Sequence, residues 1–321
     1  MLLDAEITFR MLNAIILYNQ GLIRGILLTQ VFRRKVMVGL AARDVYGDTE
    51  HFGVRSLLPL KKMAQYGDLW AQQYCNNRPF PHIGIDDFFD EHIIKRVVAS
   101  YPGEFDASWD RRFLDAGTYE EQKLGLDRLE DFPPYIQQFI NALNSRLFIA
   151  FLEKLTGIDG LIPDPYLSGG GLHMIPRGGR LAIHADFNTH RKLRLDRRLN
   201  LLLYLNYDWQ EDWGGALELW DKDVKTKEKA YLPIANRVVV FTTTDTAFHG
   251  HPDPLTSPKG KYRRSIALYY YTNGRPEDEK SADHTTIFKM RPNEIRRRRV
   301  LDVVKPFVPP IVWQLPRLFR K

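Results

Sequence analysis

The chain has 321 residues, of which 44% are hydrophobic and 26% charged, and its formal net charge is +7. These values are those of an ordinary globular protein with a sizeable core, in one large domain or two modest ones. The single cysteine, Cys75, excludes an intrachain disulfide and a CxxC zinc site. Nothing in the sequence therefore indicates an oxidising compartment, and we expect a cytoplasmic protein.

The first 77 residues are predicted to form a mostly helical extension. The chain opens with MLLDAE, which has acids where a secretory signal peptide has its basic region. Apolar residues recur at helical spacing between residues 11 and 31, but Asn13, Asn19 and Arg24 make this stretch too polar for a membrane span. We expect an amphipathic helix packed on the main domain, and a helix lying on a membrane or a partner is the alternative.

Residues 78 to 168 change to a mixed pattern of strand and helix. HIGID, at 82–86, predicts a short strand, and Asp87 is placed to cap a helix that includes Ile93 and Val97. A second helix is predicted from Pro134 to Leu155, and the DGLIPDP segment breaks it.

From Gly169 the chain reads as a series of short strands separated by turn signals. PRGG, at 176–179, predicts the turn of a hairpin, and the apolar run at 199–206 is typical of a strand that is buried on both faces. This pattern predicts a double-sheet β-sandwich or jelly roll. Strands are expected at 169–175, 180–186, 199–206, 214–221, 237–244 and 263–272.

His184 and Asp186 stand at the end of one of these strands, in LAIHADFNTH. Alternate residues of a strand share a face, so both side chains can reach one metal ion. A third ligand is available in TDTAFHGHPDP, as His249 or His251. Two histidines and one carboxylate leave coordination positions open, as non-haem Fe(II) oxygenases require. Arg263 and Arg264 follow on a later strand, where a buried arginine needs an anion that a dicarboxylate co-substrate would provide.

The order H-x-D, a long gap, H, and then R-x-S resembles the Fe(II)- and 2-oxoglutarate-dependent dioxygenases, and most closely their prolyl 4-hydroxylase-like branch. The YLN triplet, a tryptophan shortly after it, the G-G-x-L strand and FPHIGIDDFF extend the resemblance over about residues 78 to 274. The resemblance implies an α+β fold, in which a double-stranded β-helix (a cupin-like jelly roll) with flanking helices occupies residues 78–275. A helical extension, 1–77, would precede it, and a basic tail, 276–321, would follow it.

The resemblance also implies the roles of individual residues. Fe(II) would bind to His184, Asp186 and His249, the last being the first histidine of H-G-x-P. The co-substrate 2-oxoglutarate would be held by the arginine of R-x-S and by the tyrosine of YLN, and other residues would line its pocket. The implied reaction uses O2, hydroxylates an unactivated C–H bond and releases succinate and CO2, with ascorbate as a further candidate cofactor. The implied co-substrate residues are Arg263, Tyr204, Leu202, Leu217, Ser265 and His251.

The substrate does not follow from the resemblance. The segment after Asp186 is strongly basic, and a basic rim at the pocket mouth would attract an anionic small molecule, a lipid-linked substrate or an acidic peptide. The same residues would have no such role if they paired with acids elsewhere in the domain. Protein prolyl hydroxylation, a metal reaction without 2-oxoglutarate and a non-catalytic jelly-roll binding protein are the alternative functions. The basic residues concerned are Arg191, Lys192, Arg194, Arg197 and Arg198.

The C-terminal segment from His284 to Lys321 holds ten Lys and Arg residues against two acids. Prolines and aromatic residues such as Trp313 and Phe319 are mixed with this charge, which suits a peripheral contact with a membrane surface better than nucleic acid. A tail that wraps around the domain with solvated arginines is the alternative. No specific nucleic-acid partner is expected, and the sequence does not predict an oligomeric state.

Overall fold

The computed structural model describes residues 53–106, 109–113, 120–292 and 294. The amphipathic segment expected at residues 11–31 and most of the basic tail lie outside these residues, and the domain boundaries at residues 77 and 275 stay predictions. Across the described part of the chain, no helix is both long and apolar enough to cross a bilayer.

Helices occupy most of the described chain before residue 157. The single helix expected from Pro134 to Leu155 is in fact two, because Ser145 is extended, with ψ 156°, and its hydroxyl donates to the carbonyl of Ala142 at 2.6 Å. Serine and asparagine compete with helical hydrogen bonding in this way and favour helix ends. The helices are α3 (Val54–Leu57), α4 (Leu60–Asn76), α5 (Glu91–Ala99), α6 (Pro134–Leu143) and α7 (Arg146–Thr156), with 3-10 turns η1 (Leu129–Asp131), η2 (Glu211–Trp213) and η3 (Glu277–Glu279).

Two antiparallel sheets follow, which we call the major and the minor sheet. The major sheet has the order β1 (His82–Ile85), β11 (Val238–Thr242), β8 (Asp196–Tyr204), β13 (Arg263–Thr272), β6 (Gly171–Ile175), β4 (Lys123–Leu126) and β2 (Asp110–Phe113), with β5 (Ile162–Pro163) beside β13. The minor sheet has the order β10 (Lys227–Tyr231), β9 (Leu217–Trp220), β12 (His249–His251), β7 (Arg180–Ala185) and β14 (Ile287–Phe288), with β3 (Glu120–Glu121) beside β7.

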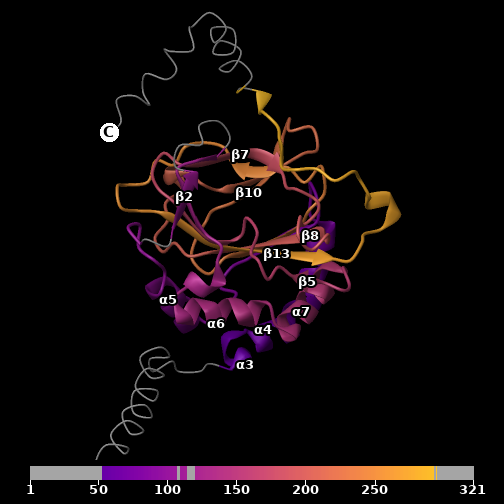
Figure 1. The fold of residues 1–321 in the computed structure, drawn as a ribbon, viewed down its shortest axis with the longest axis horizontal. Helices are drawn as coiled ribbons and strands as arrows, with labels where there is room; N and C mark the ends of the chain where they lie inside the picture. The colour runs from indigo at the N-terminus through magenta and orange to yellow at the C-terminus, as the bar shows by residue number, and fades with distance from the viewer. Residues whose placement is uncertain (1–52, 107–108, 114–119, 293, 295–321) are drawn as a thin grey trace, which may run out of the picture. The chain divides into compact units, whose positions relative to one another are not determined.

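The predicted α+β fold is confirmed, since the two sheets form a jelly-roll core with helices at its N-terminal side. Figure 1 shows α4, α5, α6 and α7 on the side of β8 and β13, whereas β7 and β10 form the opposite layer. Strands that were not predicted include β4, β10 and β14. Cys75, the only cysteine, is exposed on α4.

Strand β8 shows how the sequence divides the major sheet into two faces. Leu199, Leu201 and Leu203 are buried in the same hydrophobic cluster as the apolar faces of α6 and α7. The alternate residues therefore point into the jelly roll, because successive side chains of a strand face opposite ways. Burying each of these leucines contributes about 2 kcal/mol, so the helices are firmly attached to this sheet.

The strand register then defines the inner face of the major sheet. Ser265 on β13 pairs with Tyr204 on β8 and with His173 on β6. Two steps along the same face, beyond the Ala267–Leu202 pair, Tyr269 pairs with Asn200. The inner face therefore carries histidine, serine, asparagine and tyrosine on either side of an apolar row, and so many polar groups are unusual for a jelly-roll interior unless a ligand occupies it.

Gly171 limits the spacing of β6 and β4 and gives a test of this packing. Its φ is +82°, and a Cβ there would overlap the carbonyl oxygen of Leu126, whereas a Cβ on Gly125 would meet nothing within 4 Å. Gly171→Ala should reduce the free energy of unfolding by roughly 2 kcal/mol or more. Gly125→Ala should change it by about 0.5 kcal/mol or less. Denaturant unfolding measures both, and equal losses would contradict this account.

Candidate metal centre and pocket

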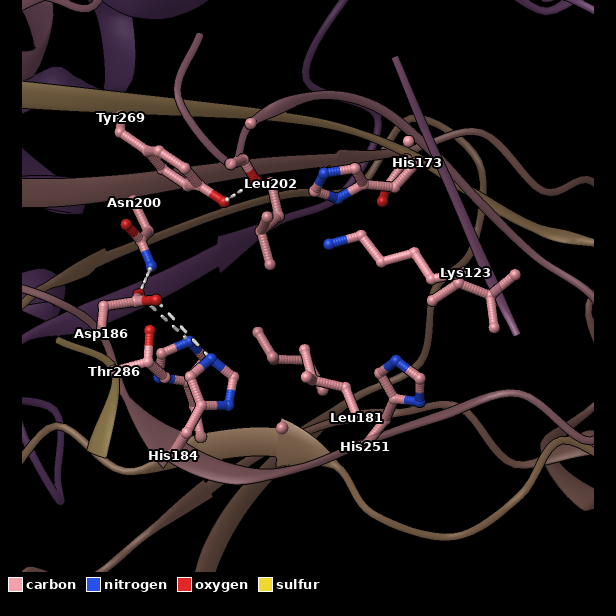
Figure 2. Close-up of a pocket in the computed structure, with 18 of the residues that line it drawn as sticks. Lys123, His173, Leu181, His184, Asp186, Asn200, Leu202, His251, Tyr269 and Thr286 are labelled. Carbon is pink, nitrogen blue, oxygen red and sulfur yellow. Dashed lines mark hydrogen bonds and ion pairs between the residues drawn. The ribbon is translucent and has the colours of Figure 1, made fainter. Parts of the chain in front are cut away.

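His184, Asp186 and His249 are brought together by the pairing of β7 with β12. His184 and His249 are register partners in this ladder, and Asp186 follows β7 directly. One ligand atom from each side chain lies within 4.8 Å of the others. Nε2 of His184 is 3.6 Å from Oδ1 of Asp186, and Nε2 of His249 is 3.5 Å from Oδ2. Figure 2 shows Asp186 and His184 close together at one end of a pocket.

The hydrogen bonds of both imidazoles leave their Nε2 atoms available as ligands. Nδ1 of His184 lies 2.8 Å from the carbonyl of Ala182, and Nδ1 of His249 lies 2.9 Å from the carbonyl of Ala247. A carbonyl only accepts, so each Nδ1 carries the proton and each Nε2 carries a lone pair. Two neutral imidazoles and one carboxylate, largely buried and aimed at one point, fit a divalent iron ion.

The electrostatics of the site keep these groups in their metal-binding forms. Burial, and then the neighbouring His184, lower the pKa of His249 to about 4, so its imidazole is neutral at pH 7. Burial alone would raise the pKa of Asp186, but Arg197 and the two imidazoles outweigh it and hold this pKa well below its ordinary value. Ligands in these forms bind a metal without first losing a proton at neutral pH.

Arg263 stands on the wall of the same cavity, which has a volume of about 470 Å³. Its side chain is buried, with Nε donating to the carbonyl of Gly215 at 2.7 Å and Nη2 donating to the hydroxyl of Tyr204 at 3.2 Å. Among the described residues no carboxylate forms an ion pair with it. A buried guanidinium of this kind is expected to bind an anion, which fits the distal carboxylate of 2-oxoglutarate.

The other residues predicted for the co-substrate lie in the same region. Leu202, Leu217, Ser265 and His251 line the cavity. Tyr204 does not itself line the cavity, but its hydroxyl accepts a hydrogen bond from Arg263 and its ring lies 5.0 Å from Cζ of that arginine. His251 is 3% exposed, and neither of its ring nitrogens has a hydrogen-bond partner within the described part of the chain.

Several pocket residues were not predicted: some lie on strands that the sequence does not reveal, and others lie on predicted strands but belong to no recognised motif. Lys123 on β4 and His173 on β6 face the cavity opposite the metal centre, as Figure 2 shows. Phe288 on β14 pairs with His184, and the two rings are 5.6 Å apart. Residues expected to belong to a tail after 275 therefore form part of the pocket wall. The only signal was the short TTIF run, which has strand composition. Phe187, Tyr269 and Thr286 complete this wall.

The basic segment after Asp186 does not form the expected open rim. Arg194 pairs with Asp283 at 2.8 Å, Arg197 with Asp186 at 3.0 Å and Arg198 with Glu279 at 3.0 Å. The alternative, pairing with acids elsewhere in the domain, is therefore correct for these three arginines. The sequence left both alternatives open because Glu279 and Asp283 are distant in sequence and lie beside the segment only in the folded chain.

The lowered pKa of His249 predicts acid sensitivity of the metal-free protein. An unfolded imidazole takes up a proton near pH 6.5, but folded His249 does so only near pH 4. Protons therefore bind preferentially to the unfolded chain across this window, and the stability due to neutral His249 is lost as the pH falls through it. The loss should reach roughly 3 kcal/mol at pH 4. Denaturant unfolding at pH 7 and pH 4 measures it. His249→Gln should show a smaller loss, and an equal loss would contradict the assignment.

Comparison with known proteins agrees with this geometry. Residues 170–289, which contain all three metal-binding candidates, match the model of the 2OG-Fe(II) oxygenase superfamily. Prolyl 3-hydroxylase OGFOD1 of Mus musculus is 27% identical over 214 residues, which cover 63% of this chain and 36% of that protein. The chain thus spans well under half the length of this curated relative.

Two solved structures are similar to the chain at low sequence identity. A prolyl hydroxylase of Trichoplax adhaerens, solved with a hypoxia inducible factor peptide fragment, is 18% identical with a TM-score of 0.46, and the match covers 66% of this chain and 91% of that one. HygX of Streptomyces hygroscopicus, solved with nickel, 2-oxoglutarate and hygromycin B, is 12% identical with a TM-score of 0.43, covering 68% and 96%. From the sequence match and the His-x-Asp and His group inside it, residues 170–289 are those of the 2OG-Fe(II) oxygenase superfamily, whose enzymes use Fe(II) and 2-oxoglutarate.

Proposed function

We propose that this oxygenase is a hydroxylase in which His184, Asp186 and His249 bind the iron. The observation that carries the proposal is that their three ligand atoms meet in the same cavity as a buried arginine, Arg263, without a described carboxylate partner. When bound, iron with 2-oxoglutarate and O2 supplies the oxidation that converts a C–H bond to C–OH, with succinate and CO2 as the other products. All three ligand positions are filled by protein groups, which supports hydroxylation rather than halide transfer.

Arg263 and Tyr204 would hold the distal carboxylate of 2-oxoglutarate. Nη2 of Arg263 donates to the oxygen of Tyr204, so the phenolic proton is available for a carboxylate oxygen. Burial raises the pKa of Tyr204, which keeps this proton in place at neutral pH. His251, with two unsatisfied nitrogens, would add a further hydrogen bond at the same end of the pocket.

The apolar walls would exclude water from the reaction. Leu202 and Leu217 line the cavity between its basic end and the metal centre, while the rings of Phe187, Tyr269 and Phe288 stand nearer the metal-binding candidates. A dry cavity strengthens the ion pair that Arg263 makes with its ligand and limits side reactions.

Succinate formation from 2-oxoglutarate with Fe(II) tests this function, and neighbouring arginines provide a matched control. Arg263 points into the cavity, whereas Arg264 lies over the ring of Tyr101 outside it. His184→Ala should abolish turnover. Arg263→Met should raise the KM for 2-oxoglutarate at least 100-fold, because a charged hydrogen-bonded pair is worth about 3 kcal/mol or more. Arg264→Met should change it less than threefold. Turnover that survives His184→Ala would refute the iron assignment.

We propose further that the substrate is a small molecule with an acidic group. Because Arg194, Arg197 and Arg198 are paired within the domain, the support for an acidic substrate comes from residues inside the pocket. Gly125 on β4 pairs with His173, which pairs with Ser265, so Lys123 lies on the same inner face as Arg263, two strands away. Figure 2 shows the ammonium group of Lys123 directed into the cavity. A cation in addition to Arg263 would match a second anionic group. A prolyl residue is the second candidate substrate, because the mouse relative is named a prolyl 3-hydroxylase.

Lys123→Met separates the two roles that this lysine can have. A small-molecule extract is divided by anion exchange, and products heavier by one oxygen atom are sought by mass spectrometry. We expect them in the retained fraction, at least tenfold reduced by Lys123→Met, with the KM for 2-oxoglutarate unchanged. Lys229→Met, on the exposed side of β10, is the control. Products from the unretained fraction would refute an acidic substrate, and a tenfold higher KM would assign Lys123 to the co-substrate.

A further inference from the structure

We infer that Arg197 and Asn200 are positioning residues that hold one oxygen of Asp186 and leave the other to the metal. The inference rests on the proposed iron site and extends it. In the sequence, Arg197 belongs to the basic segment expected at the pocket mouth. In the structure its side chain is 1% exposed and lies beside the candidate metal centre. It is among the largest fully buried side chains of the described chain.

Both residues act on the same carboxylate oxygen. Nη2 of Arg197 lies 3.0 Å from Oδ2 of Asp186, and Nδ2 of Asn200 donates to this atom at 2.6 Å. Oδ1 is contacted by neither of them, and it lies 3.6 Å from Nε2 of His184. The two oxygens therefore differ: Oδ2, which also lies 3.5 Å from Nε2 of His249, is held by Arg197 and Asn200, whereas neither of these residues contacts Oδ1.

Asn200 also connects to Arg197, so the three side chains form a closed network. Its Oδ1 accepts from Nε of Arg197 at 3.0 Å and from Nη2 at 2.8 Å. A guanidinium only donates and a carboxylate only accepts, so the amide must place its oxygen toward Arg197 and its NH2 group toward Asp186. The network thus has one hydrogen-bonding arrangement, which fixes the rotation of the carboxylate.

Aromatic rings hold the guanidinium in place. The centre of the Tyr269 ring is 3.6 Å from Cζ of Arg197, and that of Phe187 is 4.5 Å away. The backbone carbonyl of Arg197 accepts from Oγ1 of Thr243 at 2.9 Å and from Arg275 at 2.6 Å. A planar guanidinium stacked in this way has little freedom to move, and lysine cannot reproduce the stacking.

This network determines which carboxylate oxygen of Asp186 is available to bind a metal ion. With Oδ2 occupied by two donors, the carboxylate offers Oδ1 as a single ligand and keeps the remaining positions available for 2-oxoglutarate and O2. Without Arg197 and Asn200, the carboxylate of Asp186 could rotate or offer both oxygens. Residues that orient metal ligands in this manner typically change metal affinity about 10- to 100-fold when they are replaced.

Arg198 offers a matched control for an ion pair with a purely structural role. It is adjacent in sequence, 6% exposed, and pairs with Glu279 at 3.0 Å, but its side chain lies away from the metal centre. Replacing either arginine leaves an unpaired acid, so both changes should reduce stability. Only Arg197 should also alter the metal site.

Co(II) titration of the full chain tests the inference, with ligand-field absorption and thermal unfolding recorded for each variant. Arg197→Gln should weaken Co(II) binding about 10- to 100-fold and change the absorption spectrum. Asn200→Ala should act in the same direction, Arg197→Lys should restore part of the affinity, and Arg198→Gln should bind as the wild type does. If Arg197→Gln does not fold, Arg197→Lys and Asn200→Ala decide the matter by the same readouts.

Equal Co(II) affinity and spectra for Arg197→Gln and Arg198→Gln would overturn the inference, as would wild-type behaviour of both Arg197→Lys and Asn200→Ala. A failure of the iron site itself looks different. In that case His184→Ala would bind Co(II) as tightly as the wild type does, and the proposed function, rather than the positioning role, would be refuted.

Discussion

The antiparallel pairing of β7 with β12 is the constraint on which the site depends. It places His184 opposite His249, although 64 residues separate them in the sequence. Each imidazole is then fixed by a hydrogen bond to the carbonyl two residues before it, so backbone geometry alone orients both Nε2 atoms. Within the described part of the chain, Asp186 has no such backbone partner, and side chains hold its carboxylate.

Charge explains why these side chains are so strictly arranged. Burying an isolated carboxylate or guanidinium is costly, so each buried charge near the site has a specific charged or polar partner. Asp186 is paired with Arg197, and Arg198 with Glu279, whereas Arg263 has only neutral partners, Tyr204 and the carbonyl of Gly215, among the described residues. The one buried arginine of β13 without an acid is therefore the one whose charge remains available for a ligand.

The sequence predicted the fold class and named the two histidines and the aspartate that the fold brings together, because each motif that carries them is a local signal. Alternating strand patterns, the H-x-D spacing and the paired faces of Arg263 and Arg264 depend only on residues close in the chain. Lys123, Phe288 and the partners of Arg194 and Arg198 were not predictable in this way, because they depend on which strands become neighbours. The helix break at Ser145 was missed for a different reason: the apolar pattern runs through it, and only the serine hydroxyl reveals it.

The short strands β3 and β14 pair with the edge of β7 that β12 does not cover. β3 pairs with Arg180 and Leu181 at the beginning of β7, and β14 pairs with His184 and Ala185 at its end. Since β12 covers the other side, β7 presents no long open edge on which a strand of another molecule could add. The apolar strand that carries the metal-binding histidine is thus shielded from intermolecular association by two segments that contribute little to the core. The backbone hydrogen bonds that cover this edge of β7 are thus also bonds that hold the strand carrying His184 in place.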